Sequence, residues 1–234
     1  MKNVIVTGAA RGLGLAISER LVADGYYIIG IGRRPSTEFD ALKNAHFVIY
    51  DLQDVAGIAG LVRDIRKTHK PLYGLVNNAG IGLDGVLATM HSTDISKVLI
   101  VNLEAAVTMT KYVSRTMLGG GEGRIVNISS IIASTGFSGL SVYAASKAGL
   151  EGFTRSLSRE VGKAGLCVNC VAPGYMETDM TTGLESDKLA SVRRRAPLGL
   201  PTTQDAAGAV AYLLSPDGAR VTGTVVTVDG GTTA

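Results

Sequence analysis

The stretch from Thr7 to Gly14 reads Thr-Gly-Ala-Ala-Arg-Gly-Leu-Gly, and this turn decides the fold. The apolar run Val4–Thr7 leads into it and predicts a short strand, while the pattern that begins at Leu13 predicts a helix. Glycines between a strand and a helix let backbone amides approach a pyrophosphate, so the turn predicts a dinucleotide site. The alternative is a tight connection without a ligand, because a glycine-rich turn taken by itself is a weak signal.

Short apolar runs alternate with longer helical patterns along the whole chain. The expected strands are Val4–Thr7, Tyr27–Ile31, His46–Tyr50, Leu72–Asn77, Arg124–Ile128, Cys167–Val171 and Val225–Val228. The expected helices are Leu13–Asp24, Asp54–His69, Thr93–Met117, Tyr143–Ala164 and Gln204–Leu214. This order predicts an α/β fold with a doubly wound, parallel, seven-stranded sheet flanked by helices. Residues 1–234 are expected to form one domain, in which the segment 175–200 shows no clear strand or long helix and is a candidate substrate lid.

The composition indicates a folded and soluble protein. Of the 234 residues, 46% are hydrophobic and 18% are charged, a balance that excludes a disordered chain. The formal net charge is only +3, and the basic residues are scattered apart from Arg193, Arg194 and Arg195, so no nucleic-acid partner is expected. No apolar run approaches the ~20 residues of a membrane span, and no secretory signal is recognisable. We therefore expect a cytoplasmic protein without membrane contact.

Two cysteines, Cys167 and Cys170, have the C-x-x-C spacing of some redox and metal sites. They lie in the apolar run Leu166–Val171, which predicts a strand, and positions three apart in a strand face opposite sides of the sheet. A redox or metal pair needs a turn or the start of a helix. We therefore expect two buried thiols and no metal site.

Further motifs follow the glycine-rich turn in a fixed order. They are Asn77-Asn78-Ala79-Gly80, Ser130, Tyr143-x-x-x-Lys147 and Pro173-Gly174. Each has an ordinary interpretation: a strand-end cap for Asn78, a turn cap for Ser130, a core aromatic for Tyr143 and a solvated residue for Lys147. Together with the glycine spacing G-x-x-x-G-x-G they resemble the short-chain dehydrogenase/reductase family over nearly the whole chain. The resemblance implies a Rossmann fold and an oxidoreductase acting on C=O or CH–OH groups.

The four-residue spacing of Tyr143 and Lys147 places both side chains on one face of a helix. A free tyrosine has a pKa of ~10, and bringing that pKa near neutrality requires roughly 4 kcal/mol of differential stabilisation. One cation at ~4 Å in an effective dielectric of ~20 supplies about that amount. We therefore expect Lys147 to lower the pKa of Tyr143, which delivers the proton while the cofactor delivers the hydride.

The resemblance implies roles for two more polar residues. Ser130 would hydrogen-bond the substrate oxygen, and Asn102 would hold a water that relays protons to Lys147. An asparagine inside a helical stretch is also typical of a merely polar or kinked position. The expected catalytic residues are Asn102, Ser130, Tyr143 and Lys147.

The residues after the second expected strand indicate which cofactor is preferred. An acidic residue there normally holds the ribose hydroxyls of NAD, but this chain has Gly32, Arg33 and Arg34. Arg33 and Arg11 together could hold the 2′-phosphate of NADP, the alternative being ordinary solvent-exposed charge. By resemblance Asp51 would contact the adenine, unless it is only a helix cap. The expected cofactor-binding residues are Gly8, Ala9, Arg11, Gly12, Leu13, Gly14, Arg33, Asp51, Leu52, Asn78, Ala79, Gly80, Tyr143, Lys147, Pro173, Met176 and Thr178.

Within the family, two segments resemble the 3-oxoacyl-[acyl-carrier-protein] reductases of fatty acid biosynthesis: residues 171–180 and the ending Val228-Asp229-Gly230-Gly231. The resemblance implies a 3-oxoacyl thioester as substrate, NADPH as cofactor and a homotetramer. Arg124 matches a basic residue that meets the acidic acyl carrier protein, but Ala164 stands where a second arginine is expected. The alternatives are a reductase or dehydrogenase of another small ketone, sugar or secondary alcohol, and a non-catalytic NADP-binding protein.

Overall fold

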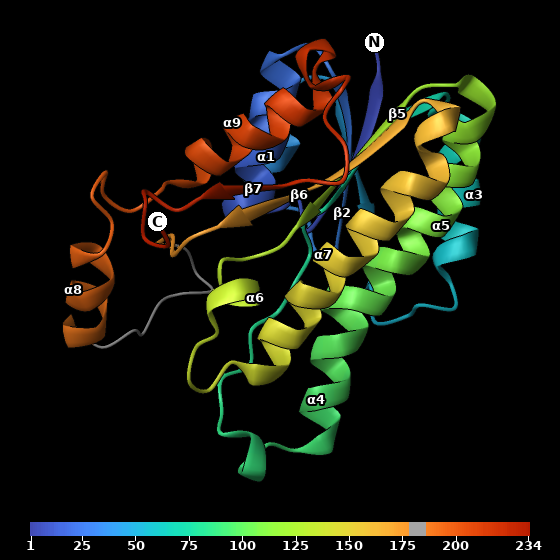
Figure 1. Cartoon of the computed structure of the whole chain (residues 1–234). Coiled ribbons are helices and arrows are strands. Elements are labelled where there is room, and N and C mark those ends of the chain that lie inside the picture. Colours follow the sequence, from blue (N-terminus) through green and yellow to red (C-terminus); the bar gives the residue numbers. More distant parts are fainter. Residues whose placement is uncertain (178–185) are drawn as a thin grey trace.

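The structure is a computed structural model that describes residues 1–177 and 186–234. A single parallel sheet runs through it in the strand order β3-β2-β1-β4-β5-β6-β7 (Figure 1). The strands are β1 Asn3–Thr7, β2 Tyr27–Gly32, β3 Ala45–Ile49, β4 Leu72–Asn77, β5 Gly123–Ile128, β6 Leu166–Pro173 and β7 Val225–Val228. The predicted doubly wound sheet of seven strands is confirmed. The strand order reverses between β1 and β4, and ligands of such sheets bind at the carboxyl ends of the strands at this switch point.

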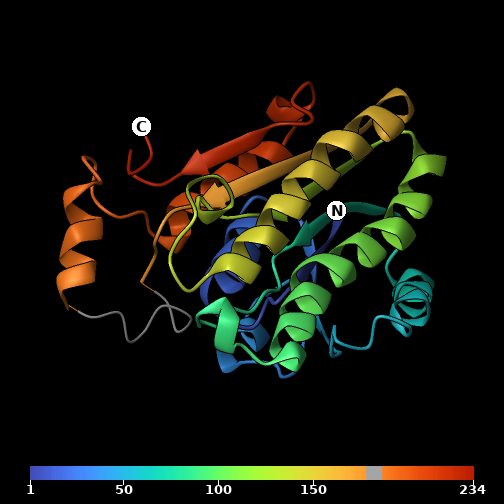
Figure 2. The same cartoon turned by 60° about the horizontal axis from the view of Figure 1, so that its bottom comes forward.

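Helices cover both faces of the sheet. Those on one face are α1 Gly12–Ala23 and α9 Thr203–Leu214, and those on the other are α3 Ile58–Thr68, α5 Ala105–Met117 and α7 Ser141–Val161. Figures 1 and 2 both show α5 and α7 lying side by side along the second face. Short 3-10 turns occupy Leu87–Thr89, Leu118–Gly120, Gly162–Ala164 and Pro216–Gly218. Every strand is parallel, and the inner strands β1, β2, β4, β5 and β6 are covered on both faces, which is why they could be recognised as short apolar runs.

The stretch Thr93–Met117 is helical throughout, as expected, but it contains a π-helical turn that the sequence did not predict. Helix α4 covers Ser92–Leu99, a π-helical turn covers Ile100–Glu104, and α5 follows from Ala105. The turn is centred on Asn102, whose side chain makes tertiary hydrogen bonds described below. A π-helical turn of this kind is frequent at functional sites.

Three short helices were not anticipated: α2 Thr37–Asp40, α6 Ile132–Thr135 and α8 Ser186–Arg194. Helix α2 has only one turn, closed by the Ser36 hydroxyl, which accepts a hydrogen bond from the Phe39 backbone N–H. One turn is too short to produce a hydrophobic period. Helix α8 lies inside the segment 175–200, for which no long helix was expected, and it stands apart from the sheet in Figure 2.

The two cysteines lie in β6 as expected, both buried and both with free thiols. The Cys170 sulfur lies 3.1 Å from the Thr154 hydroxyl, and the Cys167 sulfur lies 3.5 Å from the Ala219 carbonyl oxygen. Among the residues that the structure describes, no three His, Cys, Asp or Glu side chains are grouped as metal ligands would be. None of the helices in the described ranges is long and apolar enough to cross a membrane.

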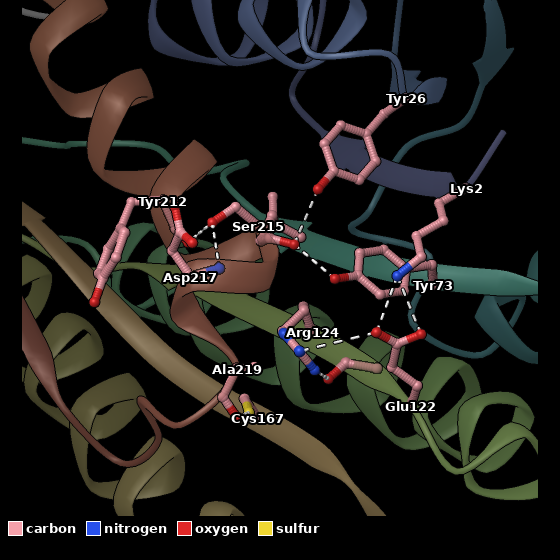
Figure 3. A network of polar contacts seen from close by, with 12 residues as sticks. Lys2, Tyr26, Tyr73, Glu122, Arg124, Cys167, Tyr212, Ser215, Asp217 and Ala219 are labelled. Carbon is pink, nitrogen blue, oxygen red and sulfur yellow. Dashed lines mark hydrogen bonds and ion pairs between the residues drawn. The ribbon is translucent and has the colours of Figure 1, made fainter.

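The edge of the sheet where the strands begin holds a polar cluster around Arg124 (Figure 3). The Arg124 side chain donates to the Gly123 carbonyl at 3.0 Å, and its guanidinium lies 5.7 Å from the centre of the Tyr73 ring. Lys2 contacts the same ring at 3.7 Å and pairs with Glu122 at 2.9 Å. Arg124 is only 4% exposed. Arg124, which by resemblance matches a residue that meets an acyl carrier protein, is therefore enclosed by aromatic and charged neighbours where the strands begin.

Candidate active site

The glycine-rich turn lies at the carboxyl end of β1 and is folded tightly onto its neighbours. Gly8 has a φ of +67°, in the left-handed region that favours glycine. Its backbone N–H donates to the Ile31 carbonyl of β2 at 2.7 Å. At Gly14 a Cβ would collide with the Gly8 carbonyl oxygen, so helix α1 can approach the turn only with glycine at that position. The sequence predicted this turn, and the structure shows why two of its glycines are required.

The start of α1 is suited to bind an anion. Arg11 occupies the N-cap with extended backbone and no capping hydrogen bond from its side chain, which has no acceptor atom. The first turn of this fully described helix carries no acidic residue. The first N–H groups of a helix have no intrahelical partner and favour negative charge. The residues present therefore fit the pyrophosphate of a dinucleotide.

Asn78 joins the glycine-rich turn to the end of β4. Its side-chain amide donates to the carbonyl oxygens of Thr7 at 2.9 Å and Gly8 at 3.2 Å. The Thr7 hydroxyl in turn accepts the backbone N–H groups of Asn78 and Ala79, both at 3.0 Å. Asn78 is thus more than a strand-end cap, because it fixes the turn. Sequence analysis did not single out Thr7 for its hydroxyl, which lies in the same network.

Ser130, Tyr143 and Lys147 are brought together by the packing of α7 against the end of β5. Ser130 follows β5, and its hydroxyl hydrogen-bonds the Tyr143 side chain from the first turn of α7. Lys147 is 3% exposed, and its ammonium donates to the Ile128 carbonyl at 2.8 Å. The ammonium nitrogen lies 5.6 Å from the centre of the Tyr143 ring. The alternative interpretation of Lys147 as a solvated helix residue is therefore wrong.

Asn102 joins the loop after β4 to helix α7. Its side-chain oxygen accepts the Ile81 N–H at 2.8 Å, and its amide donates to the Ile81 carbonyl at 2.9 Å. The same amide donates to the Ser146 hydroxyl at 3.1 Å, which donates to the Tyr143 carbonyl at 2.7 Å. At Gly80 a Cβ would lie 3.4 Å from both Asn102 Oδ1 and Lys147 Nζ, so the loop passes close to both side chains. Ser146 belongs to this chain of contacts, and its sequence gave no signal beyond its position next to Lys147.

Residues 2–189 match the family described as short chain dehydrogenase. The 3-oxoacyl-[acyl-carrier-protein] reductase FabG of Escherichia coli (strain K12) is 39% identical over 236 residues, which cover 98% of this chain and 96% of that protein. The acetoacetyl-CoA reductase of Acinetobacter sp. (strain RA3849) is 37% identical over 240 residues, with 98% and 97% covered. The chain belongs to the short-chain dehydrogenase family.

The fold of this dehydrogenase also matches solved structures. A candidate NAD(P)-dependent gluconate 5-dehydrogenase from Beutenbergia cavernae, with NADP bound at low occupancy, has a TM-score of 0.95 and 33% identity. The match covers 99% of this chain and 96% of that one. A dehydrogenase/reductase from Sinorhizobium meliloti 1021 has a TM-score of 0.90 at 33% identity, with 100% and 95% covered. Family membership makes the chain an oxidoreductase that acts on CH–OH or C=O groups.

The electrostatics of the dehydrogenase site differ from the sequence-based expectation. Burial raises the pKa of Tyr143, and the Ser130 hydrogen bond only partly opposes this. Burial also lowers the pKa of the Lys147 ammonium to about 8, and the nearby Cys170 sulfur acts weakly in the opposite direction. The expected lowering of the Tyr143 pKa by Lys147 is therefore not observed. The phenol keeps its proton at neutral pH, which suits a group that has to donate one.

Two of the residues expected to bind the cofactor are the arginines Arg11 and Arg33. Arg11 precedes α1 and Arg33 follows β2, and both are exposed. The contact between Gly8 and Ile31 joins the two segments that carry them. Asp51 is exposed and its carboxylate accepts the Gln53 N–H at 3.0 Å, so Asp51 caps a turn rather than a helix.

Leu52 and the residues after β6 complete the set of expected contacts. Leu52 is 8% exposed and packs its side chain into the core. The Pro173 carbonyl at the end of β6 accepts the Ile131 N–H at 3.1 Å, which holds it beside the segment that follows Ser130. Met176 is partly buried against the core layer of α1 and α9. Thr178 lies outside the described residues.

Proposed function

We propose that this dehydrogenase reduces the 3-oxo group of an acyl thioester, with NADPH as the hydride donor. The observation that carries the proposal is the meeting of Ser130, Tyr143 and Lys147 at the carboxyl edge of the sheet, next to the uncapped start of α1. The thioester is suggested by two relatives, a 3-oxoacyl-[acyl-carrier-protein] reductase and an acetoacetyl-CoA reductase. None of the residues expected to be catalytic is missing, which argues against a non-catalytic NADP-binding protein.

In the proposed reaction each of these side chains acts at one atom. The nicotinamide cofactor, when bound, supplies a hydride to the carbonyl carbon. Ser130 donates a hydrogen bond to the carbonyl oxygen, and Tyr143 gives its proton to the same oxygen as negative charge develops there. Lys147 stabilises the resulting phenolate and holds the ribose. Asn102, whose side chain is engaged with Ile81 and Ser146, would position a water that returns a proton to Lys147.

NADPH is the proposed donor because of the charges that flank the adenosine side. Arg11 and Arg33 can each form charge-assisted hydrogen bonds to a 2′-phosphate, and no acidic residue follows β2 before Glu38. The relative from Beutenbergia cavernae was solved with NADP, which supports the same choice. We propose the glycine-rich turn, Arg33, Asp51, Leu52, Asn78, Ala79, Gly80, Pro173, Met176 and Thr178 as the cofactor contacts.

A panel of carbonyl compounds tests the substrate. Consumption of NADPH is followed at equal concentrations of acetoacetyl-CoA, acetoacetyl-N-acetylcysteamine, a ketose, a keto-gluconate and a simple ketone. The proposal expects the two thioesters to have the highest kcat/KM. A gluconate-type substrate is the second candidate, because a structural relative is described as a gluconate 5-dehydrogenase. Higher efficiency with the keto-gluconate would replace the thioester proposal with this one.

The assembly and location of the protein are further parts of the proposal. We expect a cytoplasmic homotetramer in which the carboxyl-terminal segment lies at a subunit contact, and in which 175–200 acts as a lid over the substrate. The exposed side of α7 carries Ala145, Ala148 and Gly152, small residues that let a second helix approach closely. With Arg124 buried, docking of an acyl carrier protein would need other basic residues. Light scattering at micromolar concentration tests the tetramer, and a monomer would refute it.

A further inference from the structure

A second serine, Ser129, lies directly before Ser130 at the end of β5 and also contacts α7. The Ser129 side chain is buried, and its hydroxyl donates to a carboxylate oxygen of Glu151 on α7 at 2.7 Å. The same hydroxyl lies 3.4 Å from the Lys147 carbonyl oxygen. Ser129 thus connects the strand end that carries Ser130 to the helix that carries Tyr143 and Lys147.

The position of Glu151 on α7 is specific. It follows Lys147 by one helical turn, so both side chains face the sheet on the same side of the helix. The Glu151 side chain is only 14% exposed, and its second carboxylate oxygen lies 3.8 Å from the guanidinium of the exposed Arg155. Desolvating a carboxylate costs free energy unless a hydrogen bond compensates it. The short bond from Ser129 is such a compensation, and bonds to an ionised acceptor are roughly twice as strong as neutral ones.

Two further side-chain hydrogen bonds join α7 to the last residues of β5: the Asn127 amide donates to the Thr154 hydroxyl at 2.8 Å, and the Lys147 ammonium donates to the Ile128 carbonyl at 2.8 Å. In the proposed reaction Lys147 also has to serve the ribose and the phenolate, so its bond to Ile128 must be shared. The bond between Ser129 and Glu151 has no such second task. It can hold the distance between strand and helix constant while Lys147 changes partners.

We propose that Glu151 and Ser129 are positioning residues, which fix Ser130 relative to Tyr143 without touching substrate or cofactor. This inference rests on the proposed function only in assuming that Tyr143 donates the proton. Ser130 opposes the rise of the Tyr143 pKa through its hydrogen bond. Loosening Ser130 therefore raises the pKa of Tyr143. Reduction requires the protonated phenol, so the alkaline limb of the kcat profile moves to higher pH when the contact is lost.

The test uses four variants of the full chain: Ser129→Ala, Glu151→Ala, the double variant and Glu151→Gln. We expect each alanine variant to lose about tenfold in kcat, with the double variant no worse than either, because both changes remove the same contact. The alkaline limb should shift upward in all three. Glu151→Gln keeps an acceptor for the Ser129 hydroxyl and should restore at least about half of the wild-type kcat and the wild-type limb. The dissociation constant of NADPH should change less than about twofold in all four.

Glu160→Ala, an exposed carboxylate further along α7, is the matched control and should behave as the wild type. Rates are normalised to the folded fraction, and Ser129→Ala, which removes one oxygen atom, carries the test alone if Glu151→Ala does not fold. Wild-type kcat and pH profile in the alanine variants would overturn the proposal. A loss of kcat with an unchanged alkaline limb would also overturn the proposal, because it would indicate a merely structural role. So would a Glu151→Gln variant that fails to restore kcat, because that would indicate a role that depends only on the charge of Glu151. The variants can be assayed with any carbonyl compound that the wild type reduces. A failure of the thioester proposal would therefore appear in the substrate panel of the wild type and not in the comparison of the variants.

Discussion

Replacing Lys147 with Met should change how the stability of the dehydrogenase depends on pH. Lys147 is 3% exposed, and burial lowers its pKa from 10.5 to about 8. In the unfolded chain the ammonium regains the ordinary value. The difference of about 2.5 units corresponds to roughly 3 kcal/mol, the cost of keeping this ammonium charged in the folded protein.

The sign of this pH dependence follows from how many protons the folded and unfolded states bind. Below pH 8 both states hold the proton and the full cost is present. Between pH 8 and 10.5 the folded protein releases the proton while the unfolded chain retains it, so folding becomes more favourable as pH rises. Met has a similar length and no charge, and it removes this dependence. We therefore expect the stability of the wild type to gain about 3 kcal/mol relative to Lys147→Met between pH 7 and pH 10.5.

Urea unfolding of both proteins at pH 7, 8, 9 and 10, at fixed ionic strength and protein concentration, measures the difference. Subtracting one curve from the other cancels the groups that both proteins share. Lys163→Met, at an exposed position after α7, is the control and should show no such slope. If the difference between wild type and Lys147→Met stays constant within about 0.5 kcal/mol over this range, the ammonium does not bear the inferred desolvation cost.

Three other substitutions have distinct expected outcomes. Tyr143→Phe should lower kcat by about 10² to 10⁴ while the NADPH dissociation constant stays within about twofold, and retention of more than about a tenth of kcat would exclude Tyr143 as the general acid. Arg33→Ala should lower kcat/KM for NADPH by at least about tenfold and change kcat/KM for NADH little. If steady-state assays show the same ratio of kcat/KM for the two cofactors as in the wild type, Arg33 does not bind the 2′-phosphate. Arg124→Ala should lower the free energy of unfolding by about 2 kcal/mol or more without changing kcat or the KM of a carrier-bound substrate. A raised KM with unchanged stability would show instead that Arg124 contacts the carrier protein.

Much of the fold could be predicted because the information is local. The strands appear as short apolar runs, most of them buried on both faces, so β4 and β7 are found at the expected residues and the other strands differ only at their ends. The candidate site could be predicted for a related reason. The chemistry needs particular side chains at particular spacings, such as the single helical turn from Tyr143 to Lys147, and these spacings can be read along the chain.

What could not be predicted depends on contacts between distant segments. The side chain of Asn102, in the π-helical turn, binds the backbone of Ile81, and nothing within the helical pattern itself indicates that partner. In the sequence Arg124 is indistinguishable from an exposed basic residue, and its burial becomes visible only once the neighbouring strands are in place. The pair of Ser129 and Glu151 is separated by 22 positions and belongs to no spacing rule.

The direction of the Tyr143 pKa shows how burial changes the chemical interpretation of the site. From the spacing alone, the cation of Lys147 should make the phenol acidic before the reaction begins. In the structure, burial disfavours both charges, which raises the pKa of Tyr143 and lowers that of Lys147 to about 8. At neutral pH the phenol is therefore protonated, while Lys147, with its pKa about one unit above pH 7, is still mostly charged. In the proposed reaction Tyr143 transfers its proton and the phenolate forms beside an ammonium that the same burial had left poorly solvated, so the attraction between them develops during the transfer. An interaction that is stronger in the transition state than in the ground state raises kcat rather than substrate affinity, and we infer that this is the main contribution of Lys147.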